Sequence, residues 1–433
     1  MKISTQPYKG ARDFYPEDKA FQRWMFDKWR TVVESYGYVE YDAPILEPTD
    51  LFLIKGSEEI IKEQTYTFKD RGDRSVTIRT EMTPSVSRMV AGRRQEISYP
   101  ARWYSIPNLW RYERMQRGRL REFWQLNVDM FGVDNEMAEI EMIMIVDDLF
   151  QVFKAKRSSY TIKINSRLLV NEMLAQFKLS DESTTNIIRL IDKKNKLTEQ
   201  EFEISLNDIT KNSEKTADIL KLLATKEPSD LPVELQNLDS VKTLIKILNS
   251  LKSKGVQNVE FDITLMRGFD YYTDIVFEAF DNNSANNRAV LGGGRYDGLV
   301  GQMGVEPVPT IGFAVGDVVF KDYLGTHGLV PKISLACELT VLIRDEVSVD
   351  DAQTVAQELR EAGIKTSIDF SGRKLEKQIK SAEKAGVRFI LFVGSEEVKT
   401  ETFTLKDLKS GVEKKLSAEH VVSITKDSRI KLL

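Results

Sequence analysis

Four strand-like segments between residues 64 and 132 constrain the fold more than any other feature of the sequence. Each is rich in β-branched and aromatic residues, and turn-forming residues separate it from the next. The segments read QTYTFKD (64–70), RSVTIRT (74–80), ARWYSIPNLWRY (101–112) and EFWQLNVDMFG (122–132). Because short connections suit antiparallel neighbours, we expect an antiparallel sheet, preceded by a long helix over residues 18–36 that ends at Gly37.

The character of the chain changes between about residues 170 and 255. This stretch is rich in lysine and leucine, and Thr198 with Glu201 forms a capping box that predicts a helix start. Strand patterns resume at 259–320, with a glycine-rich turn at LGGGRYDGL (291–299). We therefore expect a helical insertion, at about 170–255, in a domain that continues after it. Its last helix should bury one stripe, ended by Gly255, that consists of Val241, Leu244, Ile245, Leu248 and Leu251.

The last hundred or so residues follow a different order, in which strands alternate with helices. Strand patterns at ELTVLI (338–343), KTSIDF (365–370) and VRFILFVG (387–394) are separated by two helical patterns that end at Gly363 and Gly386. This alternation predicts a small α/β domain with parallel strands. The expected organisation is a first domain at 1–325, a linker at 326–336 and a second domain at 337–433.

The composition excludes several classes of chemistry. A single cysteine, Cys337, allows no internal disulfide framework and no cysteine-rich zinc site, and two histidines, His327 and His420, leave little for metal ligation or a histidine base. No stretch approaches the run of about eighteen apolar residues that a membrane span needs, so we expect a cytoplasmic protein without a membrane partner. Since 62 basic and 66 acidic residues nearly cancel, any nucleic-acid surface must be a local basic patch.

The densest chemical signal is a predicted hairpin from Arg111 to Asp129, whose loop carries Gly118. Five arginines in eleven positions supply planar charged groups that suit phosphate oxygens, although a solvated charged hairpin explains them as well. In the second arm, beside Phe123 and Trp124, three polar side chains fall at alternate positions and would share one face of a strand. These three are Gln125, Asn127 and Asp129. A polar row of this kind indicates the floor of a pocket.

Taken together, these segments resemble the class II aminoacyl-tRNA synthetases, whose second signature motif reads arginine-x-glutamate, loop, aromatic. The fuller match, through RGRLREFWQ (117–125), RGFDYYT (267–273) and GGGRYDGL (292–299), is to the histidyl-tRNA synthetase family and extends over nearly the whole chain. RGFDYYT is specific to that family and its regulatory relatives. The resemblance implies an α+β fold: a catalytic domain with a six-stranded antiparallel sheet and flanking helices, the helical insertion, and a C-terminal α/β anticodon-binding domain.

The activity implied by the resemblance has two steps. L-Histidine is first activated with ATP to histidyl-adenylate, with release of pyrophosphate, and the histidyl group is then transferred to the 3′ end of tRNA(His). Glu81 and Thr83 would hold the amino group of histidine, for which a carboxylate is the natural partner. Because successive strand residues face opposite ways, one of two adjacent tyrosines could instead point into the core. The implied histidine-binding residues are Glu81, Met82, Thr83, Gln125, Asp129, Tyr271 and Tyr272.

The resemblance also implies ATP and Mg²⁺ as cofactors. Arg111 and Arg267 would be the catalytic residues, gripping the α-phosphate of ATP, and Glu113 would contact the adenine. The carboxylate of histidine attacks the phosphorus directly, so positioning and charge stabilisation would do the catalysis, with Mg²⁺ bridging the phosphates. A strand-end salt bridge is the alternative role for Arg267, and the sequence assigns no magnesium ligands. The run 292–294 suits a pocket wall but also a plain hairpin turn.

One segment departs from the family pattern. Where the third signature motif usually carries an arginine that reaches the γ-phosphate, the segment IGFAVGDVVF (311–320) has Val319. Either the chain is a catalytically inactive relative, or another residue supplies the missing charge. The candidates for that residue are Arg114, Arg119 and Arg295.

The resemblance further implies a homodimer, formed through the segment around Pro44, and contact between the C-terminal domain and tRNA. Four lysines fall along one helical stripe, as a phosphate-facing surface would, although a solvated helix face explains them nearly as well: Lys374, Lys377, Lys380 and Lys384. Two alternatives stay open, a histidine-binding regulatory relative and a class II synthetase for another amino acid. The C-terminal domain and RGFDYYT (267–273) favour the histidine enzyme.

Overall fold

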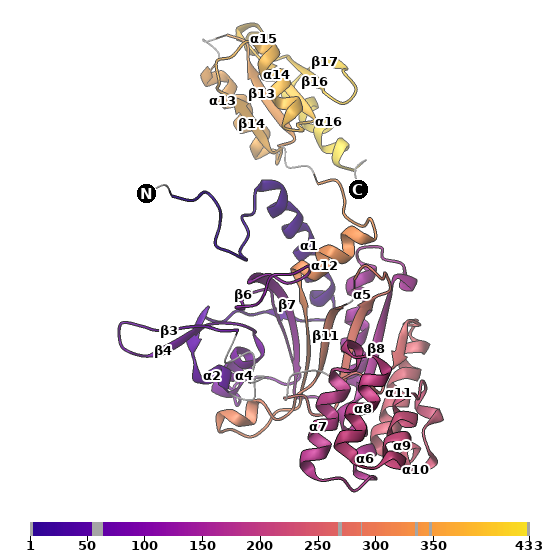
Figure 1. Ribbon diagram of the computed structural model, residues 1–433. Coiled ribbons are helices and arrows are strands. Elements are labelled where there is room, and N and C mark those ends of the chain that lie inside the picture. Colours follow the sequence, from indigo (N-terminus) through magenta and orange to yellow (C-terminus); the bar gives the residue numbers. More distant parts are fainter. Residues whose placement is uncertain are drawn as a thin grey trace. The chain divides into compact units, whose positions relative to one another are not determined.

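The computed structural model describes residues 3–53, 64–266, 271–286, 288–333, 337–345 and 349–430 (Figure 1). These residues fall into two compact units. The first comprises the chain up to Asp13 together with Gln22–Val330, and the second comprises Phe14–Phe21 together with the chain from Pro331 onward. The domain limits expected at 325, 326–336 and 337 stay a prediction. Within the described ranges, no helix combines the length and the apolar composition that crossing a membrane requires.

The first unit is built on one large sheet. Its strands are β1 (Val39–Glu40), β5 (Ala101–Ser105), β6 (Asn108–Trp110), β7 (Glu122–Phe131), β8 (Tyr160–Ser166), β9 (Val259–Phe261), β10 (Ile275–Asp281), β11 (Ala289–Arg295) and β12 (Thr310–Gly316). In the part of the chain that the structure describes, six strands in the order β5-β7-β12-β11-β10-β8 are antiparallel to their neighbours, which confirms the expected six-stranded sheet. Strands β1 and β9 extend its two edges in parallel, which the sequence did not predict.

The first two strand-like segments of the sequence do not join this sheet, contrary to our expectation of one sheet. They form a separate small sheet, in the order β2-β4-β3, whose strands are β2 (Leu46–Pro48), β3 (Tyr66–Lys69) and β4 (Ser75–Ile78). The Asp70 carboxylate accepts hydrogen bonds from the backbone N–H groups of Gly72 and Arg74 and closes a tight turn that pairs β3 with β4. Because β2 pairs with the other edge of β4, that strand has no edge left for the large sheet. Figure 1 shows this hairpin projecting away from the large sheet.

Aromatic residues from three helices form the core against the large sheet. The helices are α1 (Pro16–Ser35), α5 (Met137–Gln151) and α12 (Asp317–Thr326). Trp29 of α1 packs edge-on against Phe320 of α12 with ring centroids 5.4 Å apart, and Phe150 of α5 contacts both Phe320 and Tyr160 of β8. The expected helix stop is confirmed, since Gly37 follows α1 with φ +82°, a conformation that suits glycine. Two shorter helices, α2 (Asp50–Leu53) and α4 (Thr83–Gly92), complete the N-terminal half of the unit.

The expected helical insertion lies between β8 and β9. It comprises α6 (Arg167–Ala175), α7 (Asp181–Asp192), α8 (Glu199–Thr210), α9 (Ser213–Leu223), α10 (Val233–Gln236) and α11 (Asp239–Ser253). The capping box is present, because the side chains of Thr198 and Glu201 each accept a hydrogen bond from the other's backbone N–H. The stripe of α11 is slightly different from the expected one: Ile247 is fully buried, whereas Ile245 is only partly buried.

The second unit has its own sheet, in the order β14-β13-β15-β16-β17. Its strands are β13 (Leu339–Ile343), β14 (Thr366–Asp369), β15 (Phe389–Val393), β16 (Phe403–Asp407) and β17 (Glu413–Leu416), and its helices are α13 (Val349–Glu361), α14 (Leu375–Lys384), α15 (Ser395–Thr400) and α16 (Ala418–Ile430). The pairs β13–β14 and β13–β15 are parallel, as expected. The antiparallel extension through β16 and β17 was not predicted.

Candidate active site

The large sheet carries two adjoining cavities, which we call the inner pocket and the outer pocket. The inner pocket has a volume of about 110 Å³, and its lining includes Glu81, Thr83, Asp129, Tyr271, Tyr272 and Tyr296. The outer pocket has a volume of about 190 Å³, and its lining includes Glu113, Gly118, Arg119, Phe123, Val318 and Val319. The described residues that line both are Arg111, Gln125, Gly292 and Ala314. A molecule held in one pocket therefore lies directly beside a molecule held in the other.

Alternation along β7 builds the floor of the inner pocket. Gln125, Asn127 and Asp129 all line it, which confirms that they share one face of the strand. Leu126 and Val128 between them are fully buried. Because successive strand residues point to opposite faces, the same strand supplies a polar pocket floor and an apolar core surface.

Glycines on β12, the neighbour of β7, and on β11, the next strand of the sheet, keep this floor open. Residues 292–294 lie within β11 and not in a turn, so the turn reading was wrong, whereas Gly292 does line both pockets as a wall. A Cβ atom on Gly312 of β12 would overlap the Asp129 carboxylate, and one on Gly294 would lie 2.7 Å from the ring of Tyr272. These positions therefore need glycine because side chains from adjacent elements occupy the space.

Asp129 is a buried carboxylate in the inner pocket. Its side chain is 4% exposed, and burial raises its pKa from 3.8 to about 7. The hydroxyl of Tyr296 donates a hydrogen bond to it and acts in the opposite direction on the pKa. Tyr296 was missed at the sequence level, although it lies in the GGGRYDGL segment that carried part of the resemblance. The Asp129 carboxyl group therefore changes from neutral to negatively charged as the pH rises through about 7.

Both adjacent tyrosines line the inner pocket, and both also belong to a buried apolar cluster with Val276 and Leu299. Their ring centroids are 4.8 Å apart, and both side chains are buried, Tyr271 at 7% and Tyr272 at 8% exposure. The alternation rule does not apply because these residues precede β10 and do not belong to a strand. The Tyr271 hydroxyl donates a hydrogen bond of 3.5 Å to Glu81, another residue of the pocket lining.

The segment around α4 divides its residues between pocket and core. Glu81 and Thr83 line the inner pocket. Met82, between them, is fully buried and is not among the lining residues, so its side chain serves the core. Arg267, the other expected catalytic arginine, lies outside the described residues.

The outer pocket is framed by the predicted hairpin. β6 pairs antiparallel with the first residues of β7, and Gly118 in the loop between them has φ +74°, so the hairpin is confirmed. The Nε of Arg111 donates to the Thr80 carbonyl at 2.9 Å, and the guanidinium lies 5.4 Å from the centre of the Phe123 ring. Glu113 forms ion pairs with Arg119 at 3.2 Å and with Arg111 at 3.9 Å. One carboxylate thus sits between two arginines, which leaves the pocket net positive and suited to phosphates.

Comparison with known proteins identifies the family. The family model for histidyl-tRNA synthetase matches residues 10–317, and a model for an anticodon binding domain matches residues 338–428. The chain belongs to the histidyl-tRNA synthetase family. It is 40% identical to the histidine–tRNA ligase of Leptospira biflexa, over 95% of this chain and 94% of that protein, and 36% identical to that of Pyrococcus horikoshii, over 97% and 98%. The fold is that of the histidyl-tRNA synthetase from Nostoc sp. PCC 7120, with a TM-score of 0.85, 22% identity and coverage of 99% and 100%.

The altered third motif of this synthetase family member lies at the outer pocket. Val318 and Val319, in the first turn of α12, line it, so an apolar surface stands where a motif arginine would reach a phosphate. Of the three candidate replacements, Arg119 lines the pocket, whereas Arg114 is exposed and is not among the lining residues. Arg295 is directed elsewhere, because its guanidinium donates to Glu139 and to the Val133 carbonyl.

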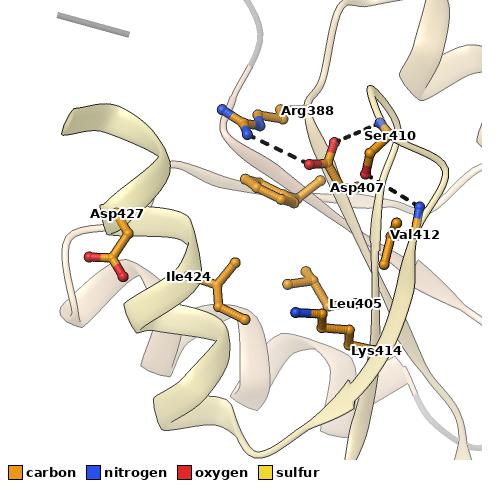
Figure 2. A pocket seen from close by; sticks show the side chains of 9 residues that line it. Arg388, Leu405, Asp407, Ser410, Val412, Lys414, Ile424 and Asp427 are labelled. Atoms are coloured by element: carbon orange, nitrogen blue, oxygen red, sulfur yellow. Dashed lines mark hydrogen bonds and ion pairs between the residues drawn. The ribbon is translucent and has the colours of Figure 1, made fainter. Parts of the chain in front are cut away.

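A further cavity of about 380 Å³ lies in the anticodon-binding domain of this synthetase family member (Figure 2). Its floor is apolar, with Leu405 and Ile424, and its rim carries Arg388, Asp407 and Asp427. Figure 2 shows the side chains of Arg388, which immediately precedes β15, and Asp407, at the end of β16, directed toward each other. Their charged groups are 3.6 Å apart. Among the residues that the structure describes, none of those expected to bind histidine or ATP lines this cavity.

Proposed function

We propose that the chain activates L-histidine with ATP at the two adjoining pockets and transfers the histidyl group to the 3′ end of tRNA(His). It is a histidine–tRNA ligase, as its full-length relatives are. The position of Arg111 is the main support for assigning the reaction to these two pockets. Arg111 borders both pockets, at the point where the carboxylate of a bound amino acid would meet the α-phosphate of a bound nucleotide.

Histidine would bind in the inner pocket with its ring toward Asp129. Glu81 and Thr83 supply oxygens for the ammonium group at one end, and Asp129 with the tyrosine hydroxyls supplies partners for the two ring nitrogens at the other. These partners are buried, so an amino acid without matching nitrogens would leave them unpaired, and this penalty gives discrimination without editing. The pKa of about 7 for Asp129 lies close to that of an imidazole, so the pair can share one proton near neutral pH.

ATP would bind in the outer pocket with its α-phosphate at Arg111. Arg111 and Arg267 would stabilise the charge that develops when the histidine carboxylate attacks the phosphorus in line and pyrophosphate leaves. Glu113 would contact the adenine, held in place by its ion pair with Arg119. The chemistry requires no protein nucleophile, because the attacking carboxylate belongs to the substrate.

Magnesium fits this site as a partner of the ATP phosphates. In the described ranges no three acidic, histidine or cysteine side chains lie close enough together to hold a metal ion. Mg²⁺ commonly keeps several waters and binds through phosphate oxygens with few protein ligands, which agrees with that finding. Bound to the phosphates, it would neutralise charge on the departing pyrophosphate.

Binding of tRNA would use the second unit and the helical insertion. The four stripe lysines on and just before α14 are all exposed, and phosphate contacts of this kind strengthen binding in a salt-dependent way. We also propose that the chain forms a homodimer and acts in the cytoplasm. For the dimer, β1 forms the edge of the large sheet with Val39 59% exposed, and a hollow of about 910 Å³ that includes Val39 and Trp103 lies beside it.

ATP–pyrophosphate exchange tests the activation step. With purified protein, we expect exchange that depends on histidine and on no other amino acid. Arg267→Ala should lower it by at least about a hundredfold, in the range found when one donor to a developing negative charge is removed. Arg189→Ala, at an exposed position on α7, is the matched control and should exchange like the wild type. Histidine binding without any exchange by the wild type would favour a regulatory protein instead.

A further inference from the structure

The outer pocket has Val319 where the family motif carries the arginine that reaches the terminal phosphates of ATP, and two other segments lie close to this position. Gly118 of the hairpin loop lies against it, since a Cβ on that glycine would be 3.4 Å from Val319 Cγ2. The segment that leads into β11 also lies beside the hairpin loop. Arg117 Nη1 donates to the carbonyl of Ala285 at 3.0 Å, which holds the segment before β11 beside the hairpin loop. The hairpin loop thus contacts both the start of α12 and the segment that leads into β11.

Arg288 lies at the end of that segment, immediately before β11. Its Nη1 atom is buried, and no atom of the described residues accepts a hydrogen bond from it. Burial lowers the pKa of Arg288, nearby Arg119 lowers it further, and Glu113 acts in the opposite direction. These effects place the guanidinium within electrostatic range of both residues, which line the outer pocket. A buried donor without an acceptor is unfavourable until an anion pairs with it.

The path of β11 supports the same placement. Ala289, Val290, Leu291 and Gly292 all line the outer pocket, whereas a regular strand would turn half of them to the other face. The register between β10 and β11 shifts at Ala279 and Phe280, and such irregularities re-aim the residues on one side of a strand. The chain just after Arg288 therefore follows the pocket wall.

We propose that Arg288 binds the terminal phosphates of ATP and so replaces the arginine that Val319 does not supply. This inference rests on the proposed use of ATP at the outer pocket. Arg119 is a weaker candidate for the same role, because its guanidinium already pairs with Glu113 at 3.2 Å. Arg295 pairs with Glu139 and is excluded.

The test compares nucleotides that differ only in the terminal phosphates. Arg288→Ala should raise the KM for ATP in pyrophosphate exchange by about ten- to a hundredfold, as expected for one charge-assisted contact, and leave the KM for histidine within about twofold. In calorimetric titrations the same variant should lose affinity for ATP and keep its affinity for AMP, which lacks the β- and γ-phosphates. Arg288→Lys should recover part of the ATP affinity. Arg189→Ala serves again as the control.

A rescue experiment locates the charge. Adding Val319→Arg to Arg288→Ala should restore part of the ATP affinity, because Val319 lines the outer pocket and Arg288 immediately precedes Ala289, which lines it too. An unchanged KM for ATP in Arg288→Ala, or an equal loss of ATP and AMP binding in both the alanine and lysine variants, would overturn the proposal. If the wild type shows no histidine-dependent exchange, the proposed function fails, and the ATP and AMP titrations still decide the role of Arg288.

Discussion

Replacing Asp129 with asparagine should stabilise the free protein at neutral pH while it removes the use of histidine. In the folded chain the pKa of Asp129 is about 7, raised from 3.8 by burial. A group whose folded pKa lies above its unfolded value contributes most to stability below the unfolded pKa, and that contribution is lost as the pH rises through the folded value. The stability of the wild type should therefore fall between about pH 4 and pH 7 because of this one carboxylate.

The magnitude follows from the two pKa values. At 1.36 kcal/mol for each pKa unit, the interval from 3.8 to about 7 corresponds to about 4 kcal/mol. Asparagine has nearly the same shape, keeps an oxygen for the Tyr296 hydroxyl and does not titrate. The difference in the free energy of unfolding between Asp129→Asn and wild type should thus grow by up to about 4 kcal/mol from pH 4 to pH 8.

Urea unfolding at a series of pH values, followed by tryptophan fluorescence, measures this difference. All five tryptophans lie in the first unit, so the signal reports on the unit that contains Asp129: Trp24, Trp29, Trp103, Trp110 and Trp124. The exposed variant Asp218→Asn should track the wild type at every pH. A difference between Asp129→Asn and wild type that stays constant from pH 4 to pH 8 would refute the reasoning, because the buried carboxylate would then carry no ionisation penalty.

Two further predictions concern packing and assembly. Arg295→Ala should lower the unfolding free energy of the first unit by about 3–5 kcal/mol in the same urea assay, because it leaves Glu139 buried without its cation. The double variant with Glu139→Ala should lose less unfolding free energy, and an equal loss in both variants would contradict this reasoning. In light scattering after gel filtration, the wild type should have twice the 49.6 kDa mass of one chain, and Val39→Lys should have the mass of a single chain. The control Ile204→Lys, at a similarly exposed position, should have the same mass as the wild type. A monomeric wild type would exclude the proposed dimer.

The elements that the sequence predicted well are those encoded in local patterns. The first helix, the capping box at Thr198, the basic hairpin and the polar row along β7 each depend on residues close together in the chain. The errors arose where a local pattern was compatible with two contexts. The glycines at 292–294 fit a turn or a crowded central strand, and only the strand's neighbours distinguish the two.

By itself the sequence determined the polar row of the inner pocket through alternation along one strand, and its resemblance to a known family implied the fold class and the other expected pocket residues, because periodicity and motifs are properties of short stretches of chain. Only the tertiary structure decided which distant groups meet. Tyr296 reaches Asp129 across 167 residues, and Arg295 reaches Glu139 across 156. It also set Arg288 within electrostatic range of Arg119 and Glu113, two residues of the outer pocket that Val319 lines. These pairings follow from the register of the central strands, which many long-range contacts set together and no local pattern records.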